Sequence, residues 1–209
     1  MTNNINMAEI FTDIYISSKW GTNNNNNYKG SSGVGSSVEY NVDYVPFLKS
    51  FIKSNDYNVI VDIGCGDFVI GDSIYNDLSV IYFGYDVYET LVNYNSNYYL
   101  DQGKYNYNFK ILDCYNKPQC IQRGDLCIIK DVFEHWSNEC IVAFLDNIIL
   151  KKMFKSILIC NCANRAVGEN DINVGEFREL SANHYPLNKY NPIVVFTYNS
   201  KEVCVINIM

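Results

Sequence analysis

Residues 59–67 constrain the fold of this chain more than any other segment. They read Val-Ile-Val-Asp-Ile-Gly-Cys-Gly-Asp, a mostly apolar run followed at once by two glycines, Gly64 and Gly66. A near-continuous apolar run is typical of a strand that is buried on both faces of a parallel sheet. Glycines after such a strand let the backbone approach a ligand closely and turn into a helix. The segment therefore predicts an α/β fold with a ligand site at the end of its first strand.

Strand-like runs alternate with helical patterns along the rest of the chain. Further strands are expected at residues 80–86, 107–113, 125–131 and 156–162, helices at 10–15, 42–52, 88–96 and 138–151, and a closing hairpin at 193–198 and 202–208. Pro46 indicates a kink or a late start in the second of these helices. This alternation predicts a Rossmann-like, seven-stranded sheet that is mostly parallel, with an antiparallel C-terminal hairpin and helices on both faces.

Composition limits the class of partner. A chain of 209 residues with 48% hydrophobic and 19% charged residues is long enough for one buried core. The net charge of −7, with only 16 Lys+Arg, makes a nucleic-acid partner unlikely on electrostatic grounds. No apolar run is long enough for a membrane span, and the first residues carry no secretory signal pattern. We therefore expect a cytoplasmic protein, or one of the host cytoplasm or virion if the chain is viral.

The cysteines indicate a reduced protein without a structural metal. The chain has 8 cysteines but no Cys-x-x-Cys pair, and neither histidine stands at zinc-site spacing from a cysteine pair. Several cysteines lie in apolar strand-like runs, where free thiols behave as small hydrophobes.

Four of the predicted strands end in an aspartate, namely Asp62, Asp86, Asp113 and Asp131. In an open α/β sheet, ligands bind beyond the carboxyl ends of the strands, so these acids should meet at one site. Val69 stands where a dinucleotide-binding loop would have its third glycine, which counts against nicotinamide binding. An acid two residues before the first glycine is instead typical of S-adenosylmethionine (SAM) sites. Singly, each acid could equally be a helix N-cap or a solvated loop residue.

These positions predict how a nucleoside cofactor would be held. Asp62 is expected to bind its amino-acid portion, and Asp86, with Val87 after it, the ribose hydroxyls, because one carboxylate can accept both. Asp113 and Cys114 stand where adenine recognition is expected. The remaining predicted contacts of this part of the chain are Gly64, Gly66, Asp67 and Lys130.

His135 is the predicted catalytic base. It follows the fourth strand, and its ordinary pKa near neutrality suits general-base work. Asp131 could orient His135 or help to position the substrate. With equal weight, a Glu-His pair at this place could merely shape the cofactor pocket. Farther on, Arg178 could clamp an anionic group or sugar hydroxyls and Asp171 the latter, or the two could form a salt bridge that staples a loop.

Separated motifs in a fixed order carry a family resemblance. They stand at residues 11–15 (Phe-Thr-Asp-Ile-Tyr) with Trp20-Gly21, at 32–36 (Ser-Gly-Val-Gly-Ser), at 62–68, at 131–135 (Asp-Val-Phe-Glu-His) and at 170–178. The chain resembles small class I SAM-dependent methyltransferases of bacteria and large DNA viruses, often encoded beside genes for surface glycans. It departs from them in the Asn run at 23–27 and in Phe177, where Trp is common.

The resemblance implies a single class I methyltransferase domain over residues 38–209. It also implies an N-terminal lid over 1–37, in which Trp20, Gly35 and Ser36 cover the cofactor. SAM would be the cofactor and S-adenosylhomocysteine (SAH) the product.

The favoured hypothesis is O-methylation of a sugar, a nucleotide-sugar or another small hydroxylated acceptor, so the partner would be a small molecule or a glycan. Two alternatives stay open. An RNA cap ribose methyltransferase would need a Lys-Asp-Lys-Glu tetrad, for which Lys130 and Asp131 are present but no second lysine is recognised. The other alternative is a protein that binds SAM without turnover.

Overall fold

The computed structural model describes residues 5–22, 30–166 and 170–208, and its centre is a seven-stranded sheet in the order β3-β2-β1-β4-β5-β7-β6. The strands are β1 (Val59–Ile63), β2 (Ile81–Asp86), β3 (Tyr107–Ile111), β4 (Leu126–Lys130), β5 (Ser156–Cys162), β6 (Ile193–Tyr198) and β7 (Lys201–Asn207). β1 to β5 pair in parallel, whereas β7 runs antiparallel to both β5 and β6. The predicted fold class is confirmed, and the closing hairpin is inserted so that β7 lies inside the sheet and β6 at its edge.

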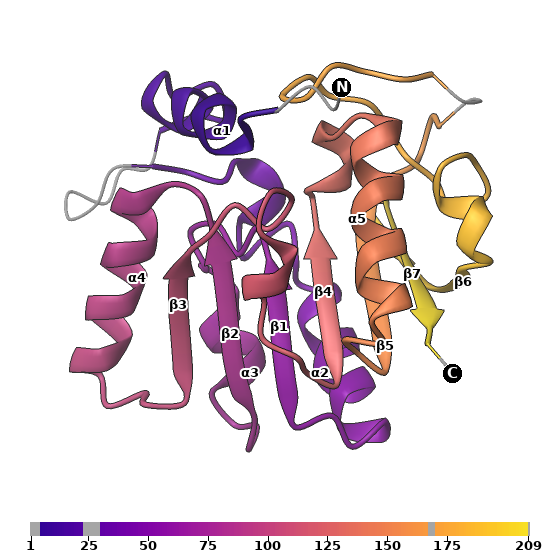
Figure 1. Cartoon of the computed structure of the whole chain (residues 1–209). Coiled ribbons are helices and arrows are strands. Elements are labelled where there is room, and N and C mark those ends of the chain that lie inside the picture. The colour runs from indigo at the N-terminus through magenta and orange to yellow at the C-terminus, as the bar shows by residue number, and fades with distance from the viewer. Residues whose placement is uncertain (1–4, 23–29, 167–169, 209) are drawn as a thin grey trace.

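Helices cover both faces of the sheet (Figure 1). They are α1 (Met7–Ile16), α2 (Tyr44–Ser54), α3 (Gly71–Tyr75), α4 (Glu89–Asp101) and α5 (Asn138–Leu150). Apolar residues of α2, α3 and α4 pack into one core cluster and those of α5 into the other. In Figure 1, α2 and α3 lie behind the sheet and α5 lies in front of it. α1 lies across the carboxyl ends of the parallel strands. No helix within the described ranges is long and apolar enough to cross a membrane.

The strand order places a ligand site beside β1. Ile60 and Val61 are fully buried, as expected of a strand with neighbours on both sides and helices on both faces. From β1 the chain builds outward through β2 and β3, then returns to add β4 on the other side of β1. Strand order therefore reverses between β1 and β4, the point at which open α/β sheets bind ligands.

The predicted elements differ from the observed ones mainly at their ends. α2 begins at Tyr44, so Pro46 falls in its first turn, where the amide that proline lacks would have had no helical partner. The helix therefore starts late, as one of the two alternatives for Pro46 predicts. The helix predicted at 88–96 continues to Asp101, and α3 was not predicted because so short a helix leaves no periodic pattern. The Asn run at 23–27 lies outside the described residues.

Candidate active site

A cavity of about 420 Å³ opens at the carboxyl ends of the central strands, beneath α1 and the short helix η1 (Val34–Ser36). All four strand-end aspartates line it. The other predicted cofactor and catalytic residues that line it are Trp20, Gly35, Ser36, Gly64, Gly66, Asp67, Val87, Cys114, Lys130 and His135. The fold thus brings residues spread over more than half of the sequence to one site.

The loop after β1 has no room for side chains at its glycines. Gly64 and Gly66 have left-handed backbone angles, with φ of 72° and 55°. A Cβ on Gly64 would lie 2.5 Å from a methyl carbon of Val132, and one on Gly66 would overlap the hydroxyl of Ser32. Glycine at these two positions therefore lets Val132 and Ser32 pack directly against the backbone of the loop, at the edge of the cavity.

Asp86 is fixed in place at the end of β2. Its Oδ2 accepts a hydrogen bond from the amide of Gly66 at 3.1 Å, and its Oδ1 accepts from the amides of Val87 at 2.7 Å and Tyr88 at 3.2 Å. Burial raises its pKa above the ordinary value, although these amides oppose the effect. The carboxylate is thus pre-oriented beside the cavity rather than free to rotate.

Asp62, near the end of β1, is a buried carboxyl in the cavity lining. The hydroxyl of Tyr82 donates to its Oδ2 at 2.8 Å. Burial raises the pKa of Asp62 to about 7, despite the opposing effects of Tyr82 and Lys130. Nearby, Tyr44 also lines the cavity, and its buried hydroxyl has no hydrogen-bond partner among the described residues. Because buried polar groups are normally paired, an unpartnered hydroxyl in a cavity wall indicates a place for a polar ligand atom.

Asp113 and Cys114 follow β3 in the cavity lining. The two carboxylate oxygens of Asp113 accept hydrogen bonds from Asn116, at 3.0 Å from its amide and 2.7 Å from its side chain. Cys114 is buried, and burial raises the pKa of its thiol well above the ordinary value. At this end of the cavity, the described residues therefore supply a buried thiol, Cys114, and a carboxylate, Asp113, whose orientation is fixed by Asn116.

The N-terminal segment forms the roof of the cavity. Hydrogen bonds join Ser32 to Asp67 of the glycine loop. The ring of Tyr15, from α1, stacks on Tyr88 with centroids 4.7 Å apart, and Trp20 meets Tyr15 edge-on at 5.1 Å. From the sequence, Ser32 is recognised only as part of a motif. Its pairing with Asp67, 35 residues away, leaves no local sequence pattern.

His135 has one ring nitrogen tied to the backbone and the other available. Its Nδ1 lies 2.9 Å from the carbonyl oxygen of Glu176, which can only accept, so Nδ1 carries the proton and neutral Nε2 keeps its lone pair. The ring packs against Trp20 at 5.3 Å and Phe177 at 5.8 Å. Burial lowers the pKa of His135 below its ordinary value, which favours the neutral ring. This is the state that a general base requires.

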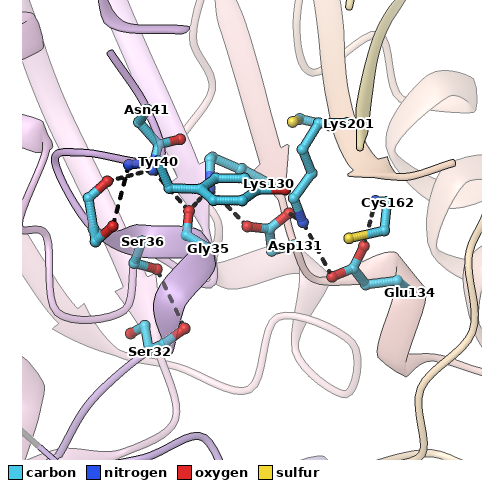
Figure 2. A network of polar contacts seen from close by, with 12 residues as sticks. Ser32, Gly35, Ser36, Tyr40, Asn41, Lys130, Asp131, Glu134, Cys162 and Lys201 are labelled. Carbon is cyan, nitrogen blue, oxygen red and sulfur yellow. Dashed lines mark hydrogen bonds and ion pairs between the residues drawn. The ribbon is translucent and has the colours of Figure 1, made fainter. Parts of the chain in front are cut away.

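Four charged side chains meet beside His135, and we call them the charged cluster: Lys130, Asp131, Glu134 and Lys201 (Figure 2). Asp131 accepts from both lysines, with Oδ2 2.6 Å from Lys130 Nζ and Oδ1 2.5 Å from Lys201 Nζ. Lys201 Nζ also lies 3.5 Å from Glu134 Oε1. Lys130 reaches the roof as well, donating to the carbonyl oxygen of Gly35 at 2.9 Å.

The charged cluster corrects one expectation. The sequence indicates no second lysine near Lys130 and Asp131, but Lys201 occupies that place from β7. Both oxygens of Asp131 are held by lysines, although its charge favours the protonated His135 ring, and its role in orienting His135 or in positioning the substrate stays a prediction. Among the described residues, the carboxylate that would form an ion pair with a protonated His135 ring is that of Glu134, whose Oε1 lies 4.0 Å from Nε2.

Both lysines of the charged cluster are held as cations. Burial alone would raise the pKa of Asp131, but the two ammonium groups bring it below its ordinary value. Burial likewise opposes the charge on Lys130 and Lys201, yet Asp131 leaves the pKa of each lysine raised. Neither lysine is therefore available as a base at neutral pH.

Asp171 and Arg178 lie outside the lining of the cavity. Arg178 donates to the carbonyl oxygens of Asn170 at 2.8 Å and Trp136 at 3.0 Å, and it pairs with Asp171 at 3.3 Å. Asp171 also accepts from the amide of Asn138 at 2.7 Å. These contacts are those of the loop-stapling alternative, so we do not assign either residue to an acceptor.

Comparison with known proteins supports the fold at low identity. No family model matches the sequence, and none of the curated proteins matches it significantly. Among solved structures, the methyltransferase domain of bacterial CtHen1-C has a TM-score of 0.63 at 13% identity, over 81% of this chain and 98% of that one. Magnesium protoporphyrin IX methyltransferase (ChlM) from Synechocystis PCC 6803 with bound SAH gives 0.63 at 12%, over 96% and 98%. The mitomycin 7-O-methyltransferase MmcR gives 0.58 at 12%, over 80% and 54%. The chain has a Rossmann-like methyltransferase fold.

Proposed function

We propose that this chain is a SAM-dependent methyltransferase that methylates a hydroxyl group of a sugar, a nucleotide-sugar or another small acceptor. One observation carries the proposal. A cavity with a tightly packed glycine loop and fixed carboxylates adjoins a neutral histidine whose Nε2 is available. The similar ChlM structure with bound SAH supports the choice of cofactor.

The residues of the cavity fit SAM. Asp62 and the unpartnered hydroxyl of Tyr44 would bind its amino-acid portion, because a carboxylate and a phenol can pair with its ammonium and carboxylate groups. Asp86 would accept from the ribose hydroxyls, and Asp113 with Cys114 would border the adenine. The segment up to residue 37 would act as the lid, with Trp20, Gly35 and Ser36 over the cofactor.

When bound, SAM would supply a methyl group on a positively charged sulfur, which would keep the electron pair of the broken carbon–sulfur bond while the acceptor oxygen gains the methyl carbon. His135 takes the hydroxyl proton at Nε2, and the carbonyl oxygen of Glu176 keeps Nδ1 protonated and the ring oriented. The rings of Trp20 and Phe177 pack against the imidazole of His135. General-base help of this kind contributes about 10²–10⁴-fold in rate.

Two measurements on the full chain test the proposal. Calorimetry with SAM, SAH and NAD should show binding of SAM and SAH, and a preference for NAD would overturn the cofactor. A methyl-donor assay against nucleotide-sugars, cell glycans and capped RNA should then release SAH with a hydroxylated small acceptor. Binding of SAM without SAH release from any acceptor would instead indicate a binding protein.

The charged cluster favours a second function, methylation of a ribose hydroxyl in capped RNA. Its composition, two lysines with an aspartate and a glutamate, is that of the tetrad expected for such an enzyme. Against it stand the net charge of −7 and the raised pKa of both lysines, which keeps them from acting as a base. A salt-sensitive complex with capped RNA, and SAH release from it, would favour this function over the first.

A further inference from the structure

His135 and Glu134 are neighbours in the short helix η3 (Phe133–His135), and their side chains meet on the cavity side of β4. The free nitrogen of His135, Nε2, lies 4.0 Å from Oε1 of Glu134. Because Nδ1 is bound to a backbone carbonyl, Nε2 is the atom at which a proton would arrive. A positive charge formed on the ring would therefore face the Glu134 carboxylate directly.

Glu134 is held in that position from two sides. Its Oε2 accepts from the amide of Cys162, the last residue of β5, at 2.6 Å. Its Oε1 lies 3.5 Å from the ammonium of Lys201. The antiparallel pairing of β5 with β7 sets Lys201 opposite Cys162, so one strand pair supplies both anchors. Glu134 is only 3% exposed, and Figure 2 shows its carboxylate between Cys162 and Lys201.

We propose that Glu134, anchored by Lys201 and the Cys162 amide, is a positioning residue that stabilises the charged form of His135 during proton transfer. The proton leaves the acceptor hydroxyl and ends on His135 Nε2, and the Glu134 carboxylate compensates the charge without taking the proton. This inference rests on the proposed function, because it presupposes that His135 is the base.

The other charges around His135 set the sign of the expected effect. Asp131 favours the charged ring, whereas Lys201 and Lys19 disfavour it. Burial raises the pKa of Glu134 above its ordinary value, and Asp131 adds to the rise, while Lys201 and the Cys162 amide oppose it. Without the Glu134 carboxylate, less negative charge opposes the effect of Lys201 and Lys19 on His135. The charged form of the His135 ring should therefore become less stable.

The test follows the ring proton of His135 by NMR as a function of pH, with Glu134→Gln and the matched control Glu139→Gln. Glu139 is an exposed acid on α5, so its removal changes the net charge equally but leaves the site intact. The His135→Gln spectrum assigns the signal, since the chain has only 2 histidines. We expect the His135 midpoint to fall by about one pH unit in Glu134→Gln and to move by less than about 0.2 in the control.

A second variant and a binding measurement separate the outcomes. If Glu134→Gln does not fold, Glu134→Asp takes its place, because it keeps the carboxylate but moves it away from His135 by one methylene. This variant should show a smaller fall of the His135 midpoint. An unchanged or raised His135 midpoint in whichever of these variants folds would overturn the inference. Calorimetry of the parent protein with SAM is read independently: if the parent binds no SAM, the proposed function fails, whatever the NMR midpoints show.

Discussion

Ser32 and Asp67 hold each other through two hydrogen bonds that run in opposite directions. The Ser32 amide donates to Asp67 Oδ2 at 3.0 Å, and the Asp67 amide donates to Ser32 Oγ at 2.8 Å. The pair joins the N-terminal roof to the glycine loop after β1, so the two walls of the cavity are fixed to one another. A ligand between them would bind to a site that is already assembled.

Ser32→Ala should weaken SAM binding by about tenfold, because the Asp67 amide loses its partner and an unmet buried hydrogen bond costs about 1–2 kcal/mol. Ser31→Ala is the matched control, since the Ser31 hydroxyl accepts only from the nearby amide of Gly33 in the contacts that the structure describes. Calorimetry with SAM measures both. Equal affinities of the two variants would show that the pair does not support the site.

Gly66→Ala should abolish SAM binding, whereas Gly103→Ala should not. Both glycines have left-handed backbone angles, with φ of 55° and 74°, so the intrinsic strain of an alanine is similar. A Cβ on Gly66 would overlap the Ser32 hydroxyl, but one on Gly103 has no described atom within 4 Å. Thermal unfolding and calorimetry of the two variants separate backbone strain from loss of the roof contact. Binding retained by Gly66→Ala would contradict this geometry.

Asp62→Asn should gain stability relative to the parent as the pH rises. The pKa of Asp62 is raised from 3.8 to about 7 in the folded protein, so burial favours the protonated carboxyl. The stability of the folded protein that depends on this protonated form is present at low pH and is lost as the pH rises through 7. Between pH 5 and pH 8, the free energy of unfolding of the variant should increase relative to that of the parent by about 2 kcal/mol. Urea unfolding at both pH values measures this. A pH-independent difference would mean that Asp62 titrates normally.

His135→Gln should lower turnover by about 10²–10⁴-fold and change SAM affinity by less than about threefold. In the parent, activity should rise with pH and reach half its maximum below about 6.5, because burial lowers the pKa of a base that must be neutral. The profile of kcat/KM against pH tests this, with His184→Gln as the control outside the cavity lining. An acid limb that persists in His135→Gln would assign it to another group.

The sheet and the place of the site could be predicted because they follow from local patterns. Apolar runs locate β1 to β5, and the rule that parallel strands end at one edge brings Asp62, Asp86, Asp113 and Asp131 together. The helix α3 has only 5 residues, too few for a periodic pattern. Short helices of this kind are set by tertiary packing, which no local pattern reports.

Lys201 could not be predicted, because its role depends on the register of a strand pair. It meets Asp131 across 70 residues only because β7 enters the sheet beside β5, with Lys201 opposite Cys162. Arg178 shows the reverse case. Its residue type is common in anion sites, but a guanidinium also satisfies buried carbonyl oxygens, and the sequence does not distinguish the two uses.

The charged cluster has a consequence for how an acceptor approaches. With both carboxylates ionised, its two ammonium groups and two carboxylates cancel, so it projects little long-range field from the floor of the cavity. The long-range field at the cavity is then left to the other carboxylates of its lining, such as Asp86 and Asp113, and to the net charge of −7. The capture rate of a neutral acceptor should therefore stay nearly constant as ionic strength changes, whereas that of an anionic acceptor should rise as salt screens the surrounding negative charge.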